Sequence, residues 1–348
     1  MPPIARGRDT RRCVPTTRPA PSPSAHLSEE TLMTASITRR PRPLRSRLAT
    51  AGAITAAGAL LLTGCGDQTA GADKGGEKET AAPLADKLPK KYQDSGVVKV
   101  GSDIAYPPVE FKDKDGKTVG LDVDLAAALG EQLGVELKFE NGTFDTLLGG
   151  LRSKRYDVAM SAMTDTKARQ EGLDSETGKK VGEGVDFVDY FTAGVSIYTN
   201  KGKDQGIKTW QDLCGKKIVV QRGTVSHDLA KAESKKCEKG EIKMETFDND
   251  QQAQTRLRSG GADAGSSDFP VAAYAVKTSG GGDHFELVGE QVEAAPYGIA
   301  ISKSNPELRD AIKAALDAII ESGEYDKIIK KWGVEDGAVT EAVVNGGK

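Results

Sequence analysis

The chain has 348 residues, of which 37% are hydrophobic and 28% charged, and its formal net charge is −3. This composition excludes a fibrous or wholly disordered protein, and the length is sufficient for two lobes with substantial hydrophobic cores.

Residues 1–64 are predicted to be a targeting segment that is absent from the mature protein. Five arginines precede an apolar, Ala-rich run from Leu48 to Leu62, which ends in Leu-Thr-Gly-Cys. This tetrapeptide resembles a lipobox, so we expect Cys65 to be lipidated and to become the first mature residue. A transmembrane anchor is the alternative, but it needs about 20 apolar residues, more than this run contains. Met33 would begin a signal peptide of ordinary length, and we expect translation to start there.

Removal of this segment changes the charge of the chain. The segment contains ten arginines and three acidic residues, so the mature chain carries a net charge of about −10. An acidic surface argues against nucleic acid as a partner, because phosphate binding depends on clustered Lys and Arg.

Two cysteines, Cys214 and Cys237, remain in the mature chain besides the lipidation site. Outside the membrane, two such cysteines most often form a disulfide, and the alternative is two separate buried thiols. The sequence contains no CxxC pair, and only two histidines, His227 and His284, remain. We therefore expect no metal site and no cofactor.

Residues 66–91 consist mostly of Gly, Ala, Lys and Glu, with almost no large apolar side chain. This composition predicts a flexible tether with an average end-to-end distance of roughly 30 Å. We expect the lipidated cysteine and the tether together to span residues 65–95.

From Val97 onwards, short apolar runs alternate with segments whose apolar residues have helical spacing. In the first helix Leu125, Leu129 and Leu133 share one face, Asp122 is a candidate cap and Gly134 ends the helix. Strands are predicted at 97–100, 135–139, 157–160, 195–198, 217–220, 242–246, 262–266, 285–288 and 297–301, and further helices at 144–151, 225–236, 250–258, 269–276 and 308–319.

This alternation predicts a parallel, doubly wound α/β sheet, in which ligands bind at the carboxyl ends of the strands. Two similar α/β series predict two lobes, and a cleft between lobes is a favoured ligand site. One strand, at 157–160, runs into the polar sequence SAMTDTKAR, which ends at Arg169. A buried strand that leads into a polar turn and a helix start predicts an anion site. A surface ion pair is the alternative role for Arg169.

The motif GLDVDL at residues 120–125, followed by Leu129, Gly130 and Leu133, resembles the signature of the family 3 extracellular solute-binding proteins. These are the polar amino-acid receptors of ABC importers. Further similar segments are GSDIAYPPVEF (101–111), YDVAMSAMTDTKAR (156–169), WQDLCGKKIVVQRGT (210–224), GADAGSSD (261–268), YGIAIS (297–302) and GEYDKIIKKWG (323–333). The resemblance covers residues 96–334.

The resemblance implies a two-lobed periplasmic-binding-protein-like fold of type II with a hinged central cleft. The chain would cross between the lobes twice, with hinges near 192–195 and 293–297. Lobe 1 would then comprise residues 96–193 and 295–335, lobe 2 residues 194–294, and a C-terminal tail residues 336–348.

The resemblance also implies how an α-amino acid would be held. Arg169 and Thr164 would bind its carboxylate, helped by the backbone N–H of Val225. Asp268 would bind its ammonium group; the alternative for Asp268 is a helix N-cap before Phe269.

The side chain of the ligand would lie in a second part of the site. There Tyr106 and Phe144 would sandwich its stem and Asp103 would accept a hydrogen bond from its polar end. Ser161 and Ala162 would form a ledge, with Ser161 a candidate donor or acceptor for the ammonium group. Gln221 and Thr224 complete the predicted set.

Asp103 beside aromatic rings disfavours glutamate and aspartate as ligands. Arginine, lysine, ornithine, histidine and glutamine remain as candidates, with cystine behind them, and Tyr106 with Ser161 favours a cationic side chain.

No catalytic residues are predicted. Ser226, His227 and Asp228 are consecutive on a predicted helix and cannot form a triad, because neighbouring helix positions point about 100° apart. The sequence contains no GxSxG, P-loop or dinucleotide GxGxxG motif. We therefore expect an exported, lipid-anchored receptor at the outer face of the cytoplasmic membrane, which delivers a polar or basic L-amino acid to an ABC permease. The alternative is a secreted dehydratase-like enzyme of the same fold.

Overall fold

The structure is a computed structural model and describes residues 82–348. The predicted targeting segment, the lipidation site Cys65 and most of the predicted tether lie outside the described residues. None of the helices in the part described has both the length and the apolar character needed to cross a bilayer.

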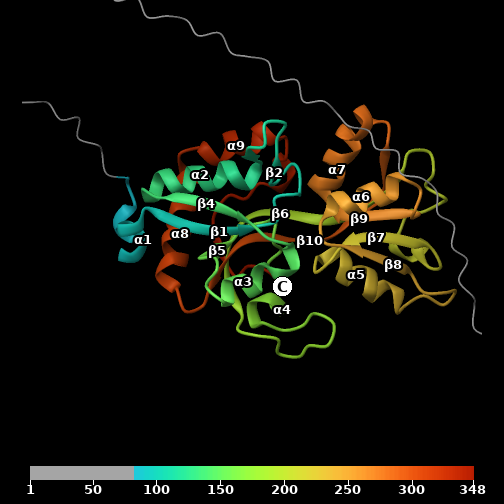
Figure 1. The fold of residues 1–348 in the computed structure, drawn as a ribbon, viewed down its shortest axis with the longest axis horizontal. Coiled ribbons are helices and arrows are strands. Elements are labelled where there is room, and N and C mark those ends of the chain that lie inside the picture. The colour runs from blue at the N-terminus through green and yellow to red at the C-terminus, as the bar shows by residue number, and fades with distance from the viewer. Residues whose placement is uncertain (1–81) are drawn as a thin grey trace, which may run out of the picture. The chain divides into compact units, whose positions relative to one another are not determined.

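A mixed nine-stranded sheet forms the centre of residues 82–348, with strand order β4-β1-β5-β10-β6-β9-β7-β8, while β11 pairs with β6. Two parallel sets, β4-β1-β5 and β9-β7-β8, are joined by the antiparallel pair β10 and β6 (Figure 1). The strands are β1 (Val97–Ser102), β4 (Glu136–Asn141), β5 (Val158–Ala159), β6 (Val185–Asn200), β7 (Lys217–Gln221), β8 (Lys243–Phe247), β9 (Ala264–Asp268), β10 (Phe285–Ser302) and β11 (Val343–Val344). A separate hairpin pairs β2 (Phe111–Lys112) with β3 (Thr118–Val119).

Helices cover both faces of this sheet, as expected for a doubly wound fold. In Figure 1, α3, α4 and α5 lie on one face, and α2, α6 and α7 lie on the other. The helices are α1 (Lys90–Ser95), α2 (Leu121–Leu133), α3 (Leu147–Arg152), α4 (Lys167–Glu171), α5 (Val225–Ser234), α6 (Asp250–Arg258), α7 (Phe269–Thr278), α8 (Pro306–Glu321) and α9 (Glu324–Trp332). Short 3₁₀ turns are η1 (Ala85–Lys87), η2 (Phe144–Thr146), η3 (Trp210–Leu213), η4 (Ser279–Gly282) and η5 (Glu335–Gly337).

Helix α2 illustrates how the sequence pattern becomes packing. Its predicted apolar face, Leu125, Leu129 and Leu133, is fully buried in the core of the first lobe. The helix ends at Gly134, whose φ of 69° is readily adopted by glycine. The prediction that Asp122 caps this helix is wrong, because Gly120 is the N-cap residue and Asp122 is a buried residue of the first turn.

Each lobe has its own apolar core, so the two-lobed α/β fold predicted from the sequence is confirmed. In the second lobe Trp210, Leu213 and Ile218 of β7 belong to one buried apolar cluster, against which Val225 and Leu229 of α5 pack. A disulfide joins Cys214 to Cys237 there, as predicted. In the chain-entropy model a loop of this size stabilises the fold by about 3 kcal/mol.

The long strands β6 and β10 pass through both lobes. Their antiparallel pairing is irregular between Val288 and Ala295 and again at Tyr297, and Glu293 has a positive φ of 54°. These irregularities lie in and beside the segments where we predicted the two hinges. Hinge motion at these segments stays a prediction.

The predicted tether is too long. Residues 82–95 are folded, because η1 and α1 pack against the first lobe and bury Leu88 and Tyr92. The Tyr92 hydroxyl also donates a 2.9 Å hydrogen bond to Asp157. Leu84, Leu88 and Tyr92 pack against the core of the first lobe, and the otherwise polar composition of the segment conceals these contacts.

Candidate ligand-binding site

All eleven residues predicted to contact a ligand line one cavity between the lobes, with a volume of about 290 Å³ including its opening. They are Asp103, Tyr106, Phe144, Ser161, Ala162, Thr164, Arg169, Gln221, Thr224, Val225 and Asp268. A larger cavity of about 730 Å³ is lined mainly by apolar residues such as Phe269 and Trp332 and lacks an arginine facing carboxylates. We therefore place the candidate site in the smaller cavity.

The fold explains why these residues meet. Asp103 follows β1, Ser161 follows β5, Gln221 ends β7 and Asp268 ends β9. The first two strands belong to one parallel set and the last two to the other, so the carboxyl ends of both sets face the same cleft.

Arg169 is anchored on both sides of the cavity. Its Nη1 donates to the Thr164 carbonyl at 2.6 Å, and its Nη2 donates to the Gly223 carbonyl of the second lobe at 3.0 Å. The guanidinium lies 5.3 Å from the centre of the Phe144 ring. Burial lowers the pKa of Arg169, while the carboxylates of Asp228, Asp268 and Asp165 oppose this shift. A fixed guanidinium of this kind can bind a carboxylate through two parallel hydrogen bonds.

The second lobe faces Arg169 with the start of α5. Val225 is the first residue of this helix, and the Thr224 hydroxyl caps it by accepting from the His227 N–H at 3.2 Å. The first N–H groups of a helix have no partner within the helix and attract anions. This geometry suits the predicted contribution of the Val225 N–H. The predicted anion site at the start of α4 is less favourable, because that helix has only five residues.

Asp268 occupies the N-cap position of α7, but its carboxylate does not cap the helix. It accepts a 2.8 Å hydrogen bond from the Tyr297 hydroxyl instead, and its N–H donates to the Tyr106 oxygen at 3.1 Å. Burial raises the pKa of Asp268 to about 6, although Tyr297, Tyr106 and Arg169 favour the ionised form. A pKa of about 6 leaves this carboxyl group mostly ionised at pH 7.

Asp103 and Gln221 contact each other across the cleft. The Gln221 Nε2 donates to Asp103 Oδ2 at 2.5 Å. Burial is the main cause that raises the pKa of Asp103 to about 6, and the nearby carboxylates of Asp145 and Asp248 raise it further. Gln221 also donates to the Asp248 carbonyl at 3.3 Å. This part of the cavity is therefore strongly acidic and attracts cations.

Two buried acids that the sequence did not mark as site residues support the ledge. The Ser161 hydroxyl donates to Glu110 at 2.6 Å and accepts from the Asp103 N–H at 3.0 Å. The Ala162 N–H donates to Asp122 at 3.1 Å. The Ser161 hydroxyl has one hydrogen, which it donates to Glu110. Towards a ligand, the Ser161 oxygen can therefore only accept a hydrogen bond.

The two aromatic residues take different positions. The Tyr106 hydroxyl is engaged by Asp268, whereas the Phe144 ring stacks against Arg169. A sandwich of both rings around a ligand stem stays a prediction. Among residues 82–348, no group of three or more His, Cys, Asp or Glu is placed to hold a metal ion.

Known proteins are similar to this chain in sequence and in fold. Residues 98–335 match the profile of a protein family described as bacterial extracellular solute-binding proteins, family 3. The chain is 31% identical over 310 residues to the arginine-binding protein ArgT of Corynebacterium glutamicum. This alignment covers 87% of this chain and 96% of ArgT.

Solved structures agree with this match. An ancestral arginine-binding protein bound to arginine is 39% identical, with a TM-score of 0.61, and the match covers 68% of this chain and 98% of that chain. An ancestral amino acid-binding protein described as a precursor of cyclohexadienyl dehydratase is 35% identical, also with a TM-score of 0.61, over 70% of this chain and 98% of that chain.

Proposed function

The chain belongs to the bacterial extracellular solute-binding proteins of family 3, and from this premise we propose that it is a lipid-anchored receptor for L-arginine or a closely similar basic amino acid. It delivers the ligand to an ABC permease. The ligand lies between the lobes, in the cavity lined by Arg169, Asp103 and Asp268.

The charge of the cavity lining carries this proposal. Arg169 contributes one positive charge, and Asp103 and Asp268 contribute two negative charges at neutral pH. An amino acid with a cationic side chain has a net charge of +1 and therefore balances the lining, whereas glutamine leaves one negative charge without a partner. Glutamate would add a further negative charge, which is costly in a buried cavity.

Each charged group of the ligand has one matching partner. Arg169, with the N–H of Val225, binds the α-carboxylate, and Asp268 with the Ser161 oxygen binds the α-ammonium. The side-chain cation lies at Asp103, where Asp145 and Asp248 add negative charge. A planar guanidinium can engage a carboxylate with two hydrogen bonds, which favours arginine over lysine.

Closure of the lobes is coupled to binding because the site is built from both of them. Asp103 and Arg169 come from one lobe, and Gln221, Val225 and Asp268 from the other. A ligand that contacts both sides stabilises the closed form by its difference in affinity for the two forms. The permease would then recognise the closed receptor.

Export and lipid anchoring rest on the sequence before residue 82. The apolar run and the Leu-Thr-Gly-Cys motif support lipidation at Cys65. Mass spectrometry of the membrane fraction tests this directly: a lipid adduct on Cys65, lost in a Cys65→Ala variant that is released from the membrane, is expected.

A second candidate is a dehydratase-like enzyme of the same fold. Two buried carboxyl groups whose pKa is about 6, Asp103 and Asp268, could exchange protons with a bound substrate near neutral pH. The similarity to the ancestral protein described as a dehydratase precursor keeps this alternative open. The balanced charges favour the receptor.

One set of titrations distinguishes the two functions. Calorimetry and thermal-shift measurements on the mature protein should give a dissociation constant for L-arginine in the micromolar range or below, about −8 kcal/mol or stronger. Lysine and glutamine should bind more weakly, and glutamate should not bind. If no amino acid raises the melting temperature and a prephenate-like carboxylate is consumed, the protein is an enzyme instead.

A further inference from the structure

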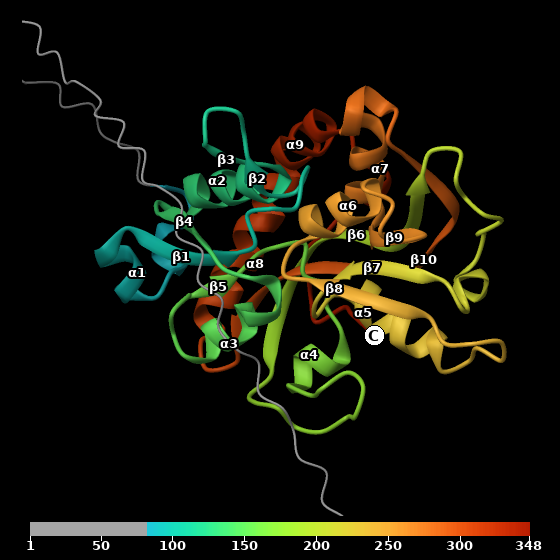
Figure 2. The same ribbon diagram turned by 45° about the vertical axis from the view of Figure 1, so that its right-hand side comes forward.

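The residues that follow the family-matched region return to the candidate site. The family match ends at residue 335, and residues 343–348, which we call the C-terminal strap, run along β6 to the turn that carries Arg169. The C-terminal end lies beside α4 in Figures 1 and 2, and the Lys167 N–H donates to the Lys348 carbonyl at 3.1 Å. The strap was predicted from the sequence only as a tail.

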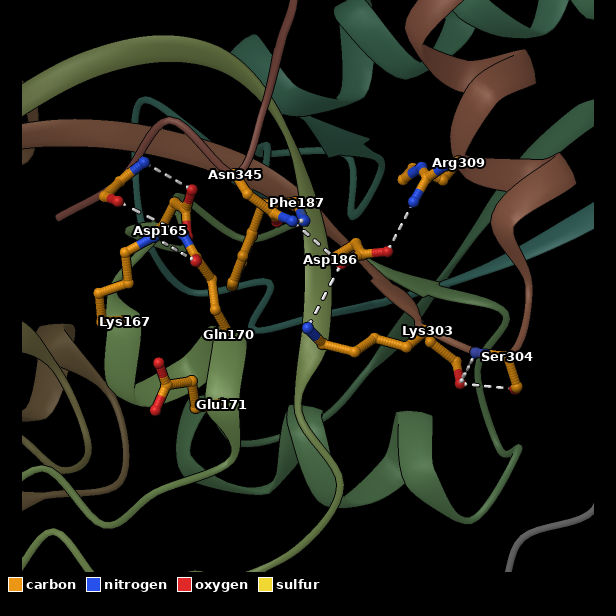
Figure 3. Close-up of polar contacts among 12 residues, drawn as sticks. Asp165, Lys167, Gln170, Glu171, Asp186, Phe187, Lys303, Ser304, Arg309 and Asn345 are labelled. Carbon is orange, nitrogen blue, oxygen red and sulfur yellow. Dashed lines mark hydrogen bonds and ion pairs between the residues drawn. The ribbon is translucent and has the colours of Figure 1, made fainter.

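The first half of the strap is fixed to β6. Val343 and Val344 form the antiparallel strand β11 opposite Asp189 and Val188. The Asn345 side chain accepts from the Phe187 N–H at 2.8 Å and donates to Asp186 at 3.0 Å (Figure 3).

Asp186 is itself held in place from the opposite side. It forms ion pairs with Arg309 at 2.9 Å and Lys303 at 3.6 Å (Figure 3). The strap is therefore docked on a rigid part of the first lobe and does not depend on exposed contacts alone.

The second half of the strap holds the turn before Arg169. The Gly346 N–H donates to Asp189 and the Gly347 N–H donates to Asp165, both at 2.8 Å. Gln170 links the other Asp165 oxygen, at 2.7 Å, to the Gly347 carbonyl, at 3.4 Å.

The fit at Gly347 admits no side chain. This residue is buried, and a Cβ atom added to it would lie 2.1 Å from the Asp165 carbonyl oxygen. Because that neighbour is backbone, it cannot swing away, and the strap or the turn would have to move. The close approach indicates a specific docking of two segments that are far apart in sequence.

The turn held in this way carries the groups proposed to bind the ligand carboxylate. Thr164 directly precedes Asp165, Arg169 directly precedes Gln170, and the Arg169 guanidinium donates to the Thr164 carbonyl. On its other side the turn is bound by β10, where the Asp165 N–H donates to the Pro296 carbonyl at 2.8 Å. Hydrogen bonds therefore hold this turn on two sides, from β10 and from the strap.

We propose that the C-terminal strap is a positioning element of the ligand site, which fixes the turn 164–170 so that Arg169 meets the ligand carboxylate without further ordering. This inference rests on the proposed function. A binding group that is already ordered loses less conformational entropy when the ligand arrives, and small misplacements of such a group are costly.

Two variants of the mature protein, one truncated after Ala342 and one with Gly347→Ala, test the proposal against a matched control. Gly149→Ala makes the same substitution at an exposed helix position where nothing lies within 4 Å of the added Cβ. Hydrogen exchange of the ligand-free proteins and calorimetric titration with L-arginine are measured for each. In the truncated protein and in Gly347→Ala, amides 164–170 should exchange faster while α8 is unchanged, and arginine affinity should fall by about tenfold or more.

A synthetic peptide of residues 340–348, added to the truncated protein, should restore both protection and affinity. A purely structural strap would lower the melting temperature and leave the arginine affinity as it is, which would overturn the proposal. Should the truncated protein exchange rapidly throughout, the comparison of Gly347→Ala with Gly149→Ala decides. Failure of the proposed function has a different signature, because the unaltered protein would then bind no amino acid.

Discussion

The side-chain amide of Gln221, at the end of β7, donates a 2.5 Å hydrogen bond to the carboxylate of Asp103, which follows β1. This bond joins the two lobes through residues of the candidate site itself. An asparagine at position 103 could still accept from Gln221, so the charge of Asp103 can be tested separately from the contact between the lobes.

Asp103→Asn should therefore change ligand preference without preventing closure. Loss of a charged hydrogen-bond acceptor should weaken L-arginine binding by about 2 kcal/mol, roughly thirtyfold. L-Glutamine, which has no side-chain charge, should lose much less. Calorimetric titration with both ligands measures the difference, with Asp115→Asn, which removes an exposed carboxylate that does not line the cavity, as the control. Equal losses for arginine and glutamine would mean that Asp103 does not select for charge.

Ligand affinity should depend on pH because both acids of the lining titrate near neutrality. Burial raises the pKa of Asp103 and of Asp268 to about 6. Both must be ionised to bind a dibasic ligand, so arginine affinity should be constant above about pH 7 and fall below pH 6. Calorimetry in buffers of different ionisation enthalpy should show proton release on binding near pH 6. Affinity that stays constant down to pH 5 would contradict the assignment.

The stability of the ligand-free protein should change in the opposite direction. A carboxyl group whose pKa is raised in the folded state binds more protons there than in the unfolded state, so stability falls as the pH rises from about 4 to the folded pKa. This applies to Asp103 and Asp268, and burial raises the pKa of Asp122, Asp189 and Asp250 to about 7. Denaturation curves should show greater stability at pH 5.5 than at pH 7.5.

Arg169 is the residue whose substitution should affect binding most. Arg169→Lys keeps the charge but removes the planar fork that contacts Thr164, Gly223 and the ligand carboxylate, so affinity should fall by roughly a hundredfold. Arg169→Ala should abolish binding while the protein stays folded. Arg222→Lys, at a half-exposed arginine that pairs with Asp248 at 3.4 Å, is the matched control and should have little effect. Retained affinity in Arg169→Lys would exclude a bidentate contact.

The sequence predicted the α/β fold from its apolar spacing, whereas the residues that line the cavity were predicted from the resemblance to the family. Regular apolar spacing marks α2 and the parallel strands, and the carboxyl ends of those strands necessarily meet at the cleft. The predicted strand 195–198 is only the end of β6, which begins at Val185. Its first half has apolar residues on both faces, as in VDFVDYF, and shows no alternation to distinguish it.

Contacts between distant segments could not be predicted from local patterns. Asp122 has the spacing of a helix cap, and only the approach of Ala162 and Tyr190 makes it a buried hydrogen-bond acceptor. The strap likewise contains few apolar residues, and its order comes from backbone N–H groups that meet Asp165 and Asp189. Such pairings depend on the tertiary fold, on which single-sequence periodicity carries no information.

A surface ion pair across the cleft should slow ligand release. Glu176, between α4 and β6, pairs with two lysines of the other lobe, with Lys231 of α5 at 3.6 Å and with Lys235, the C-cap residue of that helix, at 3.0 Å. Exposed pairs of this kind are weak, so Glu176→Gln should raise the arginine dissociation rate by only about two- to fivefold, and high salt should reduce the difference.

Stopped-flow displacement measures this rate. Glu324→Gln, which removes an exposed ion pair to Lys327 within α9, is the matched control and should leave the rate unchanged. An unchanged rate in Glu176→Gln as well would mean that the pair does not hold the closed form.

Glu110 should act on ligand binding through Ser161. Its side chain is fully buried, and burial, followed by the charge of Asp122, raises the pKa of Glu110 well above its usual range. Glutamine has a similar shape and can also accept the 2.6 Å bond from Ser161. Glu110→Gln should therefore cost at most about 1 kcal/mol of unfolding free energy and leave arginine affinity nearly unchanged.

Glu110→Ala, in contrast, removes the acceptor and leaves a cavity beneath the ledge. It should cost about 2–4 kcal/mol in urea denaturation, because a buried hydroxyl loses its partner and packing is lost. Without this acceptor the Ser161 hydroxyl is no longer held with its oxygen lone pair towards the ligand ammonium, so arginine affinity should also fall. Glu140→Ala, on the same lobe and paired with Lys99 at 3.8 Å, should change neither quantity. If Glu110→Gln and Glu110→Ala weaken arginine binding equally, the shape of the acceptor is irrelevant and Glu110 does not orient Ser161.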